Sequence, residues 1–254
     1  MSIAVAGSTP HAFFDVDETL IRVKSMFAFQ DHWYDALADE AGRAAFTDEI
    51  TRLRDAAAPR AEINRRYYRF FEGRAVAEVT ARARDWFTAL EAARPDLFIA
   101  PVVERLRAHQ MAGHEVVFVS GSFPVLIEPV AARLGVRHIL ATRMEQRDGC
   151  YTGRILPPQC IAEGKAEALR LFLKEHKVPS TDCHAYGDDI SDAPMLAAVG
   201  HLPGFATVDA RVLQSNPASV RVLEKAGFVI IEHTTSVVER HRGKPVLVLR
   251  WTAP

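Results

Sequence analysis

Short apolar runs alternate with helical patterns along much of this chain, and this alternation restricts the folds that it can adopt. Runs with the length and composition of buried strands occur at Ala12–Val16, Glu115–Ser120, His138–Ala141 and Cys183–Tyr186. Patterns typical of helices lie between them, at Pro101–Ala112, Pro124–Leu134 and Lys165–His176. Such alternation predicts parallel βαβ units, and hence an α/β fold with a doubly wound parallel sheet.

Residues 22–97 interrupt the alternation with helical patterns alone. The helices are expected at Met26–Leu37, Glu40–Ala57, Ala61–Phe71 and Val76–Leu90. We therefore predict a helical domain at residues 22–97, inserted into an α/β core of residues 1–21 and 98–205. Within the core, the turn pair Asp148-Gly149 predicts a hairpin over Ala141–Ile155.

The composition argues against several classes of protein. Hydrophobic residues make up 48% of the 254 residues and charged residues 25%, and the formal net charge is -1. These values are ordinary for a globular protein and give no indication of nucleic-acid binding. No apolar stretch has the length of a membrane span, and the N-terminus lacks a signal-peptide pattern. The three widely spaced cysteines fit neither a disulfide framework nor a zinc site, so we expect a cytoplasmic protein without a membrane partner.

Two carboxylates follow the first predicted strand. Asp15 and Asp17 lie two residues apart, and side chains at that spacing point the same way along a strand. One carboxylate can then serve as nucleophile or metal ligand while the other donates a proton. The alternative is a strand that ends in two solvated acids.

A hydroxyl-rich turn follows the second predicted strand. Ser120, Gly121 and Ser122 lie just before the helix that begins at Pro124, and we assign them to substrate binding. Their hydroxyls, and the free N–H groups at a helix start, can donate hydrogen bonds to phosphate oxygens. A plain Ser/Gly turn with a helix cap is the alternative.

Charged residues occur at two further junctions. Lys165 opens a predicted helix, where its ammonium can neutralise a phosphoryl group unless it is an ordinary surface lysine. Asp188, Asp189 and Asp192 follow the last predicted strand and repel one another unless a cation is present. Their oxygens suit Mg²⁺, whereas the alternative is an acidic turn that caps the next helix.

The joint order of these motifs is more specific than any one of them. Asp-x-Asp-x-Thr, a strand-end Ser, a Lys and Gly-Asp-Asp-x-x-Asp together resemble the four motifs of the haloacid dehalogenase superfamily of phosphohydrolases, over residues 12–205. The resemblance is strongest to subfamily IB, the branch with phosphoserine phosphatases, whose string before the lysine is similar to residues 148–153. It implies a Rossmann-like core and identifies the helical insertion as a mobile cap of the C1 type.

The resemblance also implies residue roles around the phosphoryl group. Asp15 would attack phosphorus and form an aspartyl-phosphate. Asp17 would protonate the leaving alcohol and later activate water, while its backbone carbonyl binds Mg²⁺. Thr19 would order the loop and contact the substrate, and Ser120 and Lys165 would hold the transferring oxygens.

By the same resemblance, the metal ligands are Asp15, Asp17 and Asp188. Asp192 would support Lys165 or the water molecules on the metal. Asp189 is assigned a supporting role only, because its position varies in the superfamily, and which of Asp189 and Asp192 contacts the metal stays open.

Substrate choice is expected to lie in the insertion. Phosphoserine phosphatases of this branch carry a glutamate nine residues after the nucleophile that binds the substrate ammonium, and here that position is Lys24. A cation would repel an ammonium, so Lys24 argues against phosphoserine and for a more anionic substrate. Other basic residues of the insertion could act with it or lie on a solvated helix face: Arg52, Arg65, Arg66 and Arg69.

The last segment, residues 206–254, departs from the phosphohydrolase pattern. Asn216–Phe228, with the strand-like runs Val229–Glu232 and Lys244–Trp251, resembles the end of Gcn5-related N-acetyltransferases. That family's Gly-rich pyrophosphate signature is missing, so a structural helix-and-hairpin tail is favoured, at the sheet edge or as the contact of a homodimer.

The sequence thus predicts a Mg²⁺-dependent phosphatase that hydrolyses a small phosphomonoester other than phosphoserine. A phosphotransferase or mutase of the same superfamily is one alternative. A binding protein without catalysis is another, and acetyl transfer by the tail is the least favoured.

Overall fold

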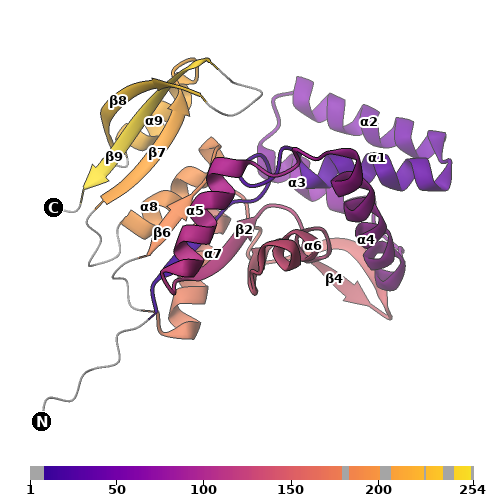
Figure 1. The fold of residues 1–254 in the computed structure, drawn as a ribbon. Coiled ribbons are helices and arrows are strands. Elements are labelled where there is room, and N and C mark those ends of the chain that lie inside the picture. The colour runs from indigo at the N-terminus through magenta and orange to yellow at the C-terminus, as the bar shows by residue number, and fades with distance from the viewer. Residues whose placement is uncertain (1–8, 179–182, 201–206, 226, 237–242, 253–254) are drawn as a thin grey trace, which may run out of the picture.

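A computed structural model describes residues 9–178, 183–200, 207–225, 227–236 and 243–252. A parallel sheet with strand order β3-β2-β1-β6 forms the centre of the described structure (Figure 1). Its strands are β1 (His11–Phe14), β2 (Glu115–Ser120), β3 (His138–Ala141) and β6 (His184–Tyr186). The predicted α/β fold with a parallel sheet is therefore confirmed.

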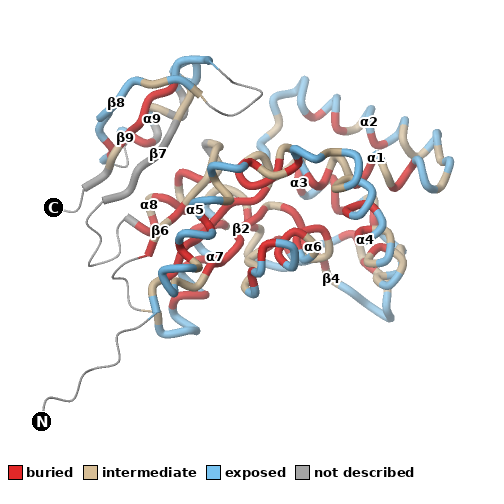
Figure 2. The backbone as a smooth tube through the Cα atoms, viewed as in Figure 1, coloured by how far each residue is buried: buried red, intermediate tan, exposed pale blue. Residues whose placement is uncertain are grey.

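Side chains alternate between the two faces of this sheet. Phe14 and Phe118 pack with α5 (Ala100–Met111) and α6 (Pro124–Leu134) in one apolar core. Phe13, which precedes Phe14 on β1, faces the other side of the sheet. It packs with α7 (Glu163–His176) and α8 (Ala193–Gly200) in a second core. Both faces are covered, so the central strands β1 and β2 are buried along nearly their whole length, whereas the outer strands β3 and β6 are only partly buried (Figure 2).

Strand β1 begins one residue earlier and ends two residues earlier than predicted. It ends at Phe14 because the chain then folds back on itself, with the amides of Leu20 and Ile21 both donating to the Val16 carbonyl (2.8 and 3.1 Å). The two aspartates of the first motif therefore lie on a compact loop beyond the strand.

In the sequence, four helices separate β1 from the next strand of the sheet, and they fall within residues 22–97, where helices were expected. They are α1 (Ser25–Leu37), α2 (Glu40–Asp55), α3 (Arg60–Arg69) and α4 (Val76–Ala93). Aromatic side chains join them to the core: the ring of Phe123, at the start of α6, lies 6.4 Å from Phe29 and 5.5 Å from Phe71, between ring centres. Aromatic pairs at these separations add to the free energy of burial.

The expected hairpin consists of β4 (Arg143–Arg147) and β5 (Cys150–Leu156). Both turn residues are left-handed, with φ of 51° at Asp148 and 76° at Gly149, as a two-residue hairpin turn requires. Backbone hydrogen bonds of Tyr151 with Gly73 and Arg74 (2.8 and 2.9 Å) tie this hairpin to the helical insertion.

The C-terminal segment contains β7 (Thr207–Leu213), α9 (Pro217–Lys225), β8 (Val229–Thr235) and β9 (Pro245–Thr252). The strands form a separate antiparallel sheet, in the order β7-β9-β8. Leu223, Phe228 and Leu249 are buried in the same core as α7 and α8. The acetyltransferase resemblance and the homodimer contact of this segment stay predictions.

None of the helices in the described ranges is both long enough and apolar enough to cross a lipid bilayer.

Truncation of Phe123 should destabilise the protein strongly. Phe123 is 1% exposed and packs against rings from the insertion, so Phe123→Ala should lower the free energy of unfolding by about 3–5 kcal/mol. Leu171→Ala is the control, since Leu171 on α7 is 51% exposed and its removal should change the value by less than about 0.5 kcal/mol. Urea unfolding measures the free energy of unfolding of both variants. A similar decrease in the two variants would contradict the proposed packing of Phe123.

Candidate active site

The polar motifs predicted from the sequence converge at the carboxyl-terminal edge of the parallel sheet. A cavity of about 360 Å³ opens there, and most of the predicted site residues line it. Those lining it are Asp15, Asp17, Lys24, Ser120, Gly121, Ser122, Lys165, Asp188, Asp189 and Asp192. Thr19 lies beneath it and hydrogen-bonds to two of these residues.

Asp15 is held at the floor of the cavity. Its backbone N–H donates to the carbonyl of Tyr186 at 2.9 Å, which fixes the start of the loop to β6. The Thr19 hydroxyl lies 3.0 Å from Asp15 Oδ2 and 3.0 Å from Asp188 Oδ1. Thr19 therefore joins the first and last acidic motifs, an ordering role that fits the one expected of it.

Lys165 pairs with two buried carboxylates. It is the third residue of α7, and its ammonium donates to Asp15 Oδ1 and Asp192 Oδ1, both at 2.5 Å. Burial disfavours the ammonium, but the two carboxylates outweigh that effect and raise the pKa of Lys165. The surface-lysine alternative is therefore wrong, because the whole residue is only 4% exposed.

Burial also raises the pKa of Asp15 well above its usual value, and the nearby carboxylates of Asp192 and Asp188 act in the same direction. Lys165 opposes this rise. A second cation near the three carboxylates would further favour ionised Asp15, the form needed in a nucleophile.

Asp17 lines the same cavity as Asp15, but its carboxyl has a different environment. Its Oδ2 accepts a hydrogen bond from the Ser25 hydroxyl at 2.9 Å, whereas its buried Oδ1 has no hydrogen-bond partner among the described residues. Burial, partly offset by hydrogen bonds from Ser25, raises the pKa of Asp17 to about 6. A carboxyl in this range can donate and accept a proton near neutral pH.

The serine turn is held from both sides. The Ser122 amide donates to Ser120 Oγ at 3.1 Å, and the Ser122 hydroxyl lies 2.9 Å from that of Ser25. The carbonyl of Gly121 accepts hydrogen bonds from Asn64 Nδ2 and Tyr68 Oη, both at 2.9 Å. Because these two side chains belong to α3, the insertion directly orders the turn that we expect to bind phosphate.

The last acidic motif is folded tightly around Asp192. The short 3-10 helix η1 (Ile190–Asp192) forms the second half of the motif, and Asp189 N–H donates to Asp192 Oδ2 at 3.1 Å. A Cβ at Gly187 would lie 2.6 Å from the Asp192 carboxyl, so only glycine allows this close approach. Asp189 itself points toward the insertion, where its Oδ1 pairs with Arg60 at 2.5 Å.

The insertion contributes three cations to the cavity wall, and only one of them was predicted. Lys24 lines the cavity, as expected, and its ammonium lies 3.3 Å from Glu18 Oε2. Arg54 and Arg60, which the sequence analysis missed, line it as well. They occupy the end of α2 and the start of α3, next to the arginines that were proposed, and no motif marked them.

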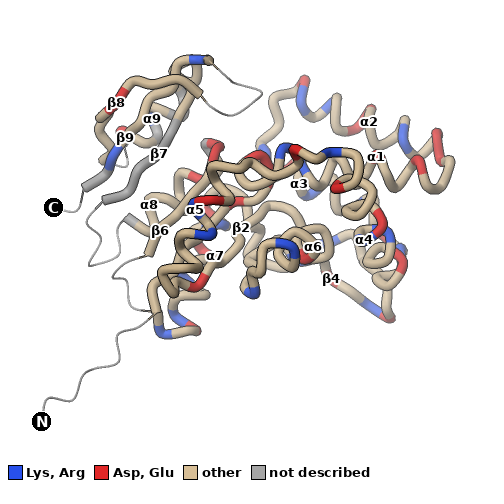
Figure 3. The backbone as a smooth tube through the Cα atoms, viewed as in Figure 1, with Lys and Arg blue, Asp and Glu red and all other residues tan. Residues whose placement is uncertain are grey.

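The four arginines proposed from the sequence do not line this cavity. Arg52 and Arg66 pair with Glu49, and Arg65 donates to the side chain of Gln159 at 2.9 Å. Arg69, which also lies outside the cavity lining, is exposed in the last turn of α3. The solvated-face alternative thus holds for this set, and Figure 3 shows charges of both signs interspersed along α2.

The acidic residues fit a hard divalent cation. Asp15, Asp188 and Asp192 each offer a carboxylate oxygen, and these oxygens lie within 4.8 Å of one another. Oxygen-only donors beside a phosphate site suit Mg²⁺. The third carboxylate of this group is that of Asp192 and not that of Asp17, whose expected contribution is its backbone carbonyl and stays a prediction.

Sequence comparison identifies the family. The profile of the haloacid dehalogenase-like hydrolase family matches residues 12–197, and the chain belongs to this family. A Mycobacterium tuberculosis protein named as a probable phosphatase is 34% identical over 194 residues, which cover 75% of this chain and 66% of that protein. A phosphoserine phosphatase of the same organism is 32% identical over 215 residues, covering 78% of this chain and 68% of its own length. The chain thus matches about two thirds of these relatives.

Solved structures share the fold. A Bordetella pertussis protein of unknown function superposes with a TM-score of 0.64 at 26% identity, covering 75% of this chain and 87% of its own. Phosphoserine phosphatase in its apo form gives a TM-score of 0.51 at 20% identity, with coverage of 75% and 82%. The α/β fold is therefore that of phosphoserine phosphatase-like members of the family.

Asp17→Asn should stabilise the metal-free protein more at pH 8 than at pH 4. The pKa of Asp17 is about 6 in the folded chain against 3.8 for an unperturbed aspartate. Because the folded value is higher, protonated Asp17 favours folding at low pH, and this contribution is lost as the pH rises through 6. Asparagine stays neutral at both pH values. The free energy of unfolding of the variant, relative to that of the wild type, should therefore be roughly 2 kcal/mol higher at pH 8 than at pH 4.

Urea unfolding in the presence of EDTA measures this gain. Asp85→Asn, on the exposed surface of α4, is the matched control for loss of one carboxylate. An Asp17→Asn effect of the same size at pH 4 and pH 8 would contradict the raised pKa.

Proposed function

We propose that the protein is a Mg²⁺-dependent phosphomonoesterase that works through an aspartyl-phosphate on Asp15. The observation that carries the proposal is the buried triad in which Lys165 binds both Asp15 and Asp192, at the floor of a cavity that also contains Asp17. A carboxylate held against an ammonium, with a second carboxyl of raised pKa above it, supplies a nucleophile and a proton donor. The family membership and the phosphatase names of two relatives support it.

In the first half-reaction, a carboxylate oxygen of Asp15 bonds to phosphorus and the bond from phosphorus to the ester oxygen breaks. Protonated Asp17 gives its proton to that oxygen, and the alcohol leaves. In the second half-reaction, Asp17 takes a proton from water as the water oxygen attacks phosphorus. Inorganic phosphate leaves and the Asp15 carboxylate is restored.

The transferring phosphoryl group needs positive charge and hydrogen-bond donors around its equatorial oxygens. Lys165 supplies an ammonium, and the turn of Ser120, Gly121 and Ser122, which lines the same cavity, supplies hydroxyl and backbone N–H groups. Bound by the acidic cluster, Mg²⁺ would neutralise part of the charge that phosphate and carboxylates bring together.

The part of the cavity lined by the insertion favours a leaving group with its own negative charge. Lys24, Arg54 and Arg60 line it, and they exceed in number the two carboxylates paired with them there, Glu18 and Asp189. Apolar side chains of Phe27 and Ile63 lie beside them, and the Arg54 guanidinium stacks over the Phe27 ring at 4.8 Å. We infer that the substrate is a small phosphomonoester with a second anionic group and a short apolar part.

Phosphoserine fits this wall poorly. Its ammonium would approach Lys24, and like charges at close range disfavour binding. We therefore propose that the substrate differs from that of the relative named phosphoserine phosphatase.

Release of inorganic phosphate from simple esters would separate hydrolysis from the mutase alternative, in which the phosphoryl group passes to another acceptor. A protein without catalysis would release none from a broad panel of phosphomonoesters. Binding of acetyl-CoA would be needed to support acetyl transfer by the C-terminal segment.

Asp15→Asn should abolish turnover while the protein stays folded. The amide retains the size of the side chain but is a poor nucleophile, so kcat for p-nitrophenyl phosphate should fall at least about a thousandfold. Phosphate release measures the loss, and far-UV circular dichroism confirms the fold. Wild-type activity in this variant would refute the nucleophile assignment.

Lys24→Glu should move selectivity toward ammonium-bearing substrates. Phosphoserine and 3-phosphoglycerate form a matched pair, since an ammonium in the first replaces a hydroxyl in the second. The variant should raise the ratio of kcat/KM for phosphoserine over 3-phosphoglycerate by about tenfold, which corresponds to about 1.4 kcal/mol.

Arg66→Glu is the control for this charge reversal. Arg66 lies on the same insertion but pairs with Glu49 outside the cavity, so the ratio should stay the same. An unchanged ratio in Lys24→Glu would show that Lys24 does not contact the substrate, whether or not the chain is a phosphatase.

A further inference from the structure

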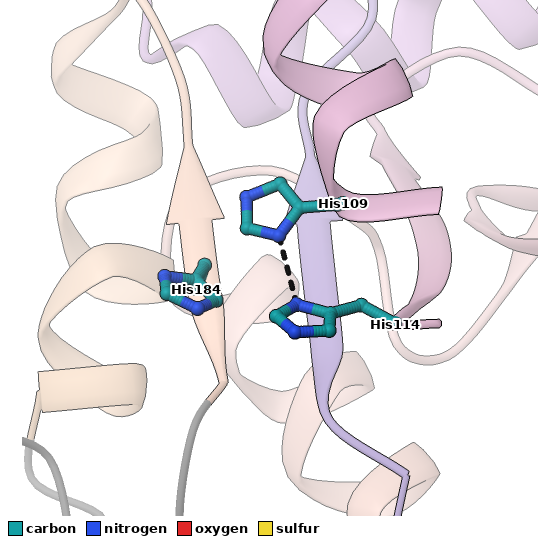
Figure 4. Close-up of side chains that lie close together, drawn as sticks. All are labelled: His109, His114 and His184. Atoms are coloured by element: carbon teal, nitrogen blue, oxygen red, sulfur yellow. Dashed lines mark hydrogen bonds between the residues drawn. The ribbon is translucent and has the colours of Figure 1, made fainter. Parts of the chain in front are cut away.

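Three histidines meet beside the parallel sheet, away from the acidic cavity. His109 lies in the last turn of α5, His114 lies in the connection from α5 to β2, and His184 is the first residue of β6. Figure 4 shows the three rings gathered between α5 and the strands. None of them lines the active-site cavity.

The rings are close enough to share one ion. The ring centre of His109 lies 5.0 Å from that of His114 and 4.5 Å from that of His184. The rings of His114 and His184 stack at 5.6 Å with an interplanar angle of 14°. One nitrogen from each ring lies within 4.8 Å of the other two, so the set offers three convergent donor atoms.

Tyr186 orients the most buried of these rings. The two nitrogens of His109 face different partners: Nε2 lies 2.8 Å from Tyr186 Oη, and Nδ1 lies 2.9 Å from Nδ1 of His114. When Nε2–H donates to the tyrosine oxygen, the Nδ1 lone pair points toward His114. A partner on the far nitrogen is the usual arrangement behind a metal-binding histidine.

We propose that His109, His114 and His184 form a second metal site, which binds Zn²⁺ through three imidazole nitrogens and leaves a fourth position for water. Imidazole suits Zn²⁺, whereas the oxygen-lined cavity suits Mg²⁺, so the chain separates two metals by ligand chemistry. Tetrahedral Zn²⁺ with bonds of about 2.05 Å needs nitrogens about 3.3 Å apart. Binding would therefore require the half-buried rings of His114 and His184 to rotate until the nitrogens reach this spacing.

The site would cross-link the strand that precedes the last acidic motif. His184 begins β6 and Tyr186 ends it, and the Tyr186 ring stacks on Phe14 at 4.4 Å. A bound ion would fasten α5 and the start of β2 to β6. Because its three ligands come from separate segments of the chain, loss of the ion should lower stability without removing the catalytic groups.

Metal binding to the full-length protein tests this proposal. The protein is stripped with EDTA and returned to excess Mg²⁺, which occupies the carboxylate site, and is then titrated with Zn²⁺ against a chromogenic chelator. Co²⁺ serves as a spectroscopic probe, because tetrahedral nitrogen ligation gives stronger visible absorption than octahedral oxygen ligation. We expect one equivalent bound at micromolar or lower concentration and a Tm that rises with Zn²⁺.

Variants locate the site. His114→Gln and His184→Gln should each weaken Zn²⁺ binding at least about tenfold and abolish the Co²⁺ band, and Tyr186→Phe should weaken binding about tenfold without changing the number of ions. His138→Gln is the matched control, because His138 is a half-buried histidine that packs against Phe172 at 5.3 Å, on the opposite core. Asp15→Asn should leave Zn²⁺ binding unchanged.

Two results would overturn the proposal. The first is wild-type protein that binds no Zn²⁺ at micromolar concentration, which would leave the cluster as a hydrogen-bonded set of histidines. The second is Zn²⁺ affinity that survives in both His114→Gln and His184→Gln but falls in Asp15→Asn, which would place the ion in the acidic cavity.

Discussion

The contact of Lys165 with Asp15 and Asp192 is the constraint on which the rest of the site depends. Three charged groups lie in a place where each is nearly inaccessible to water. An unpaired buried charge costs several kcal/mol, so none of the three is stable there without the others. The fold must therefore bring together β1, α7 and the loop after β6 before the site can exist, and the parallel sheet does this because the carboxyl ends of β1 and β6 meet at one edge.

The charges of this triad do not cancel. Two carboxylates share one ammonium, and Asp188 approaches the same place through Thr19. Burial and the excess of negative charge both raise the pKa of Asp15, and the negative charge makes the metal-free site a poor place for a phosphate dianion. This imbalance is the physical reason to expect a divalent cation, because a cation would stabilise both the nucleophile and the approach of the substrate.

The insertion acts on the same site from the opposite side. Asn64 and Tyr68 bind the carbonyl of Gly121, and Arg60 pairs with Asp189. Movement of α3 would therefore disturb both the serine turn and the last acidic motif. The insertion thus completes the geometry of the serine turn and of the last acidic motif, through polar residues at its boundary with the core.

Sequence alone predicted the parts of this structure that depend on local pattern. Strand β2 and helix α6 match their expected ranges because an unbroken apolar run and a proline at a helix start are local signals. The motif residues were predicted because strand ends in a parallel sheet meet at one edge. Arg54 and Arg60 were missed because a helical insertion places its charges by tertiary packing, and neighbouring arginines on α2 and α3 look alike in sequence.

The histidine cluster was missed for a related reason. His109 and His114 have a spacing that zinc-binding histidines can show, but that pair alone is a weak signal, and His184 lies 70 residues beyond His114. Only the parallel pairing of β1 with both β2 and β6 brings them together. The same pairing places the carboxyl ends of these strands at the catalytic edge, so Tyr186 serves both regions: its ring orients His109, and its carbonyl accepts the hydrogen bond from Asp15. A three-residue strand thus connects a nitrogen-lined cluster at its start to an oxygen-lined cavity beyond its end. A change that shifts the Tyr186 ring would therefore also displace the Tyr186 carbonyl, which holds the backbone of Asp15.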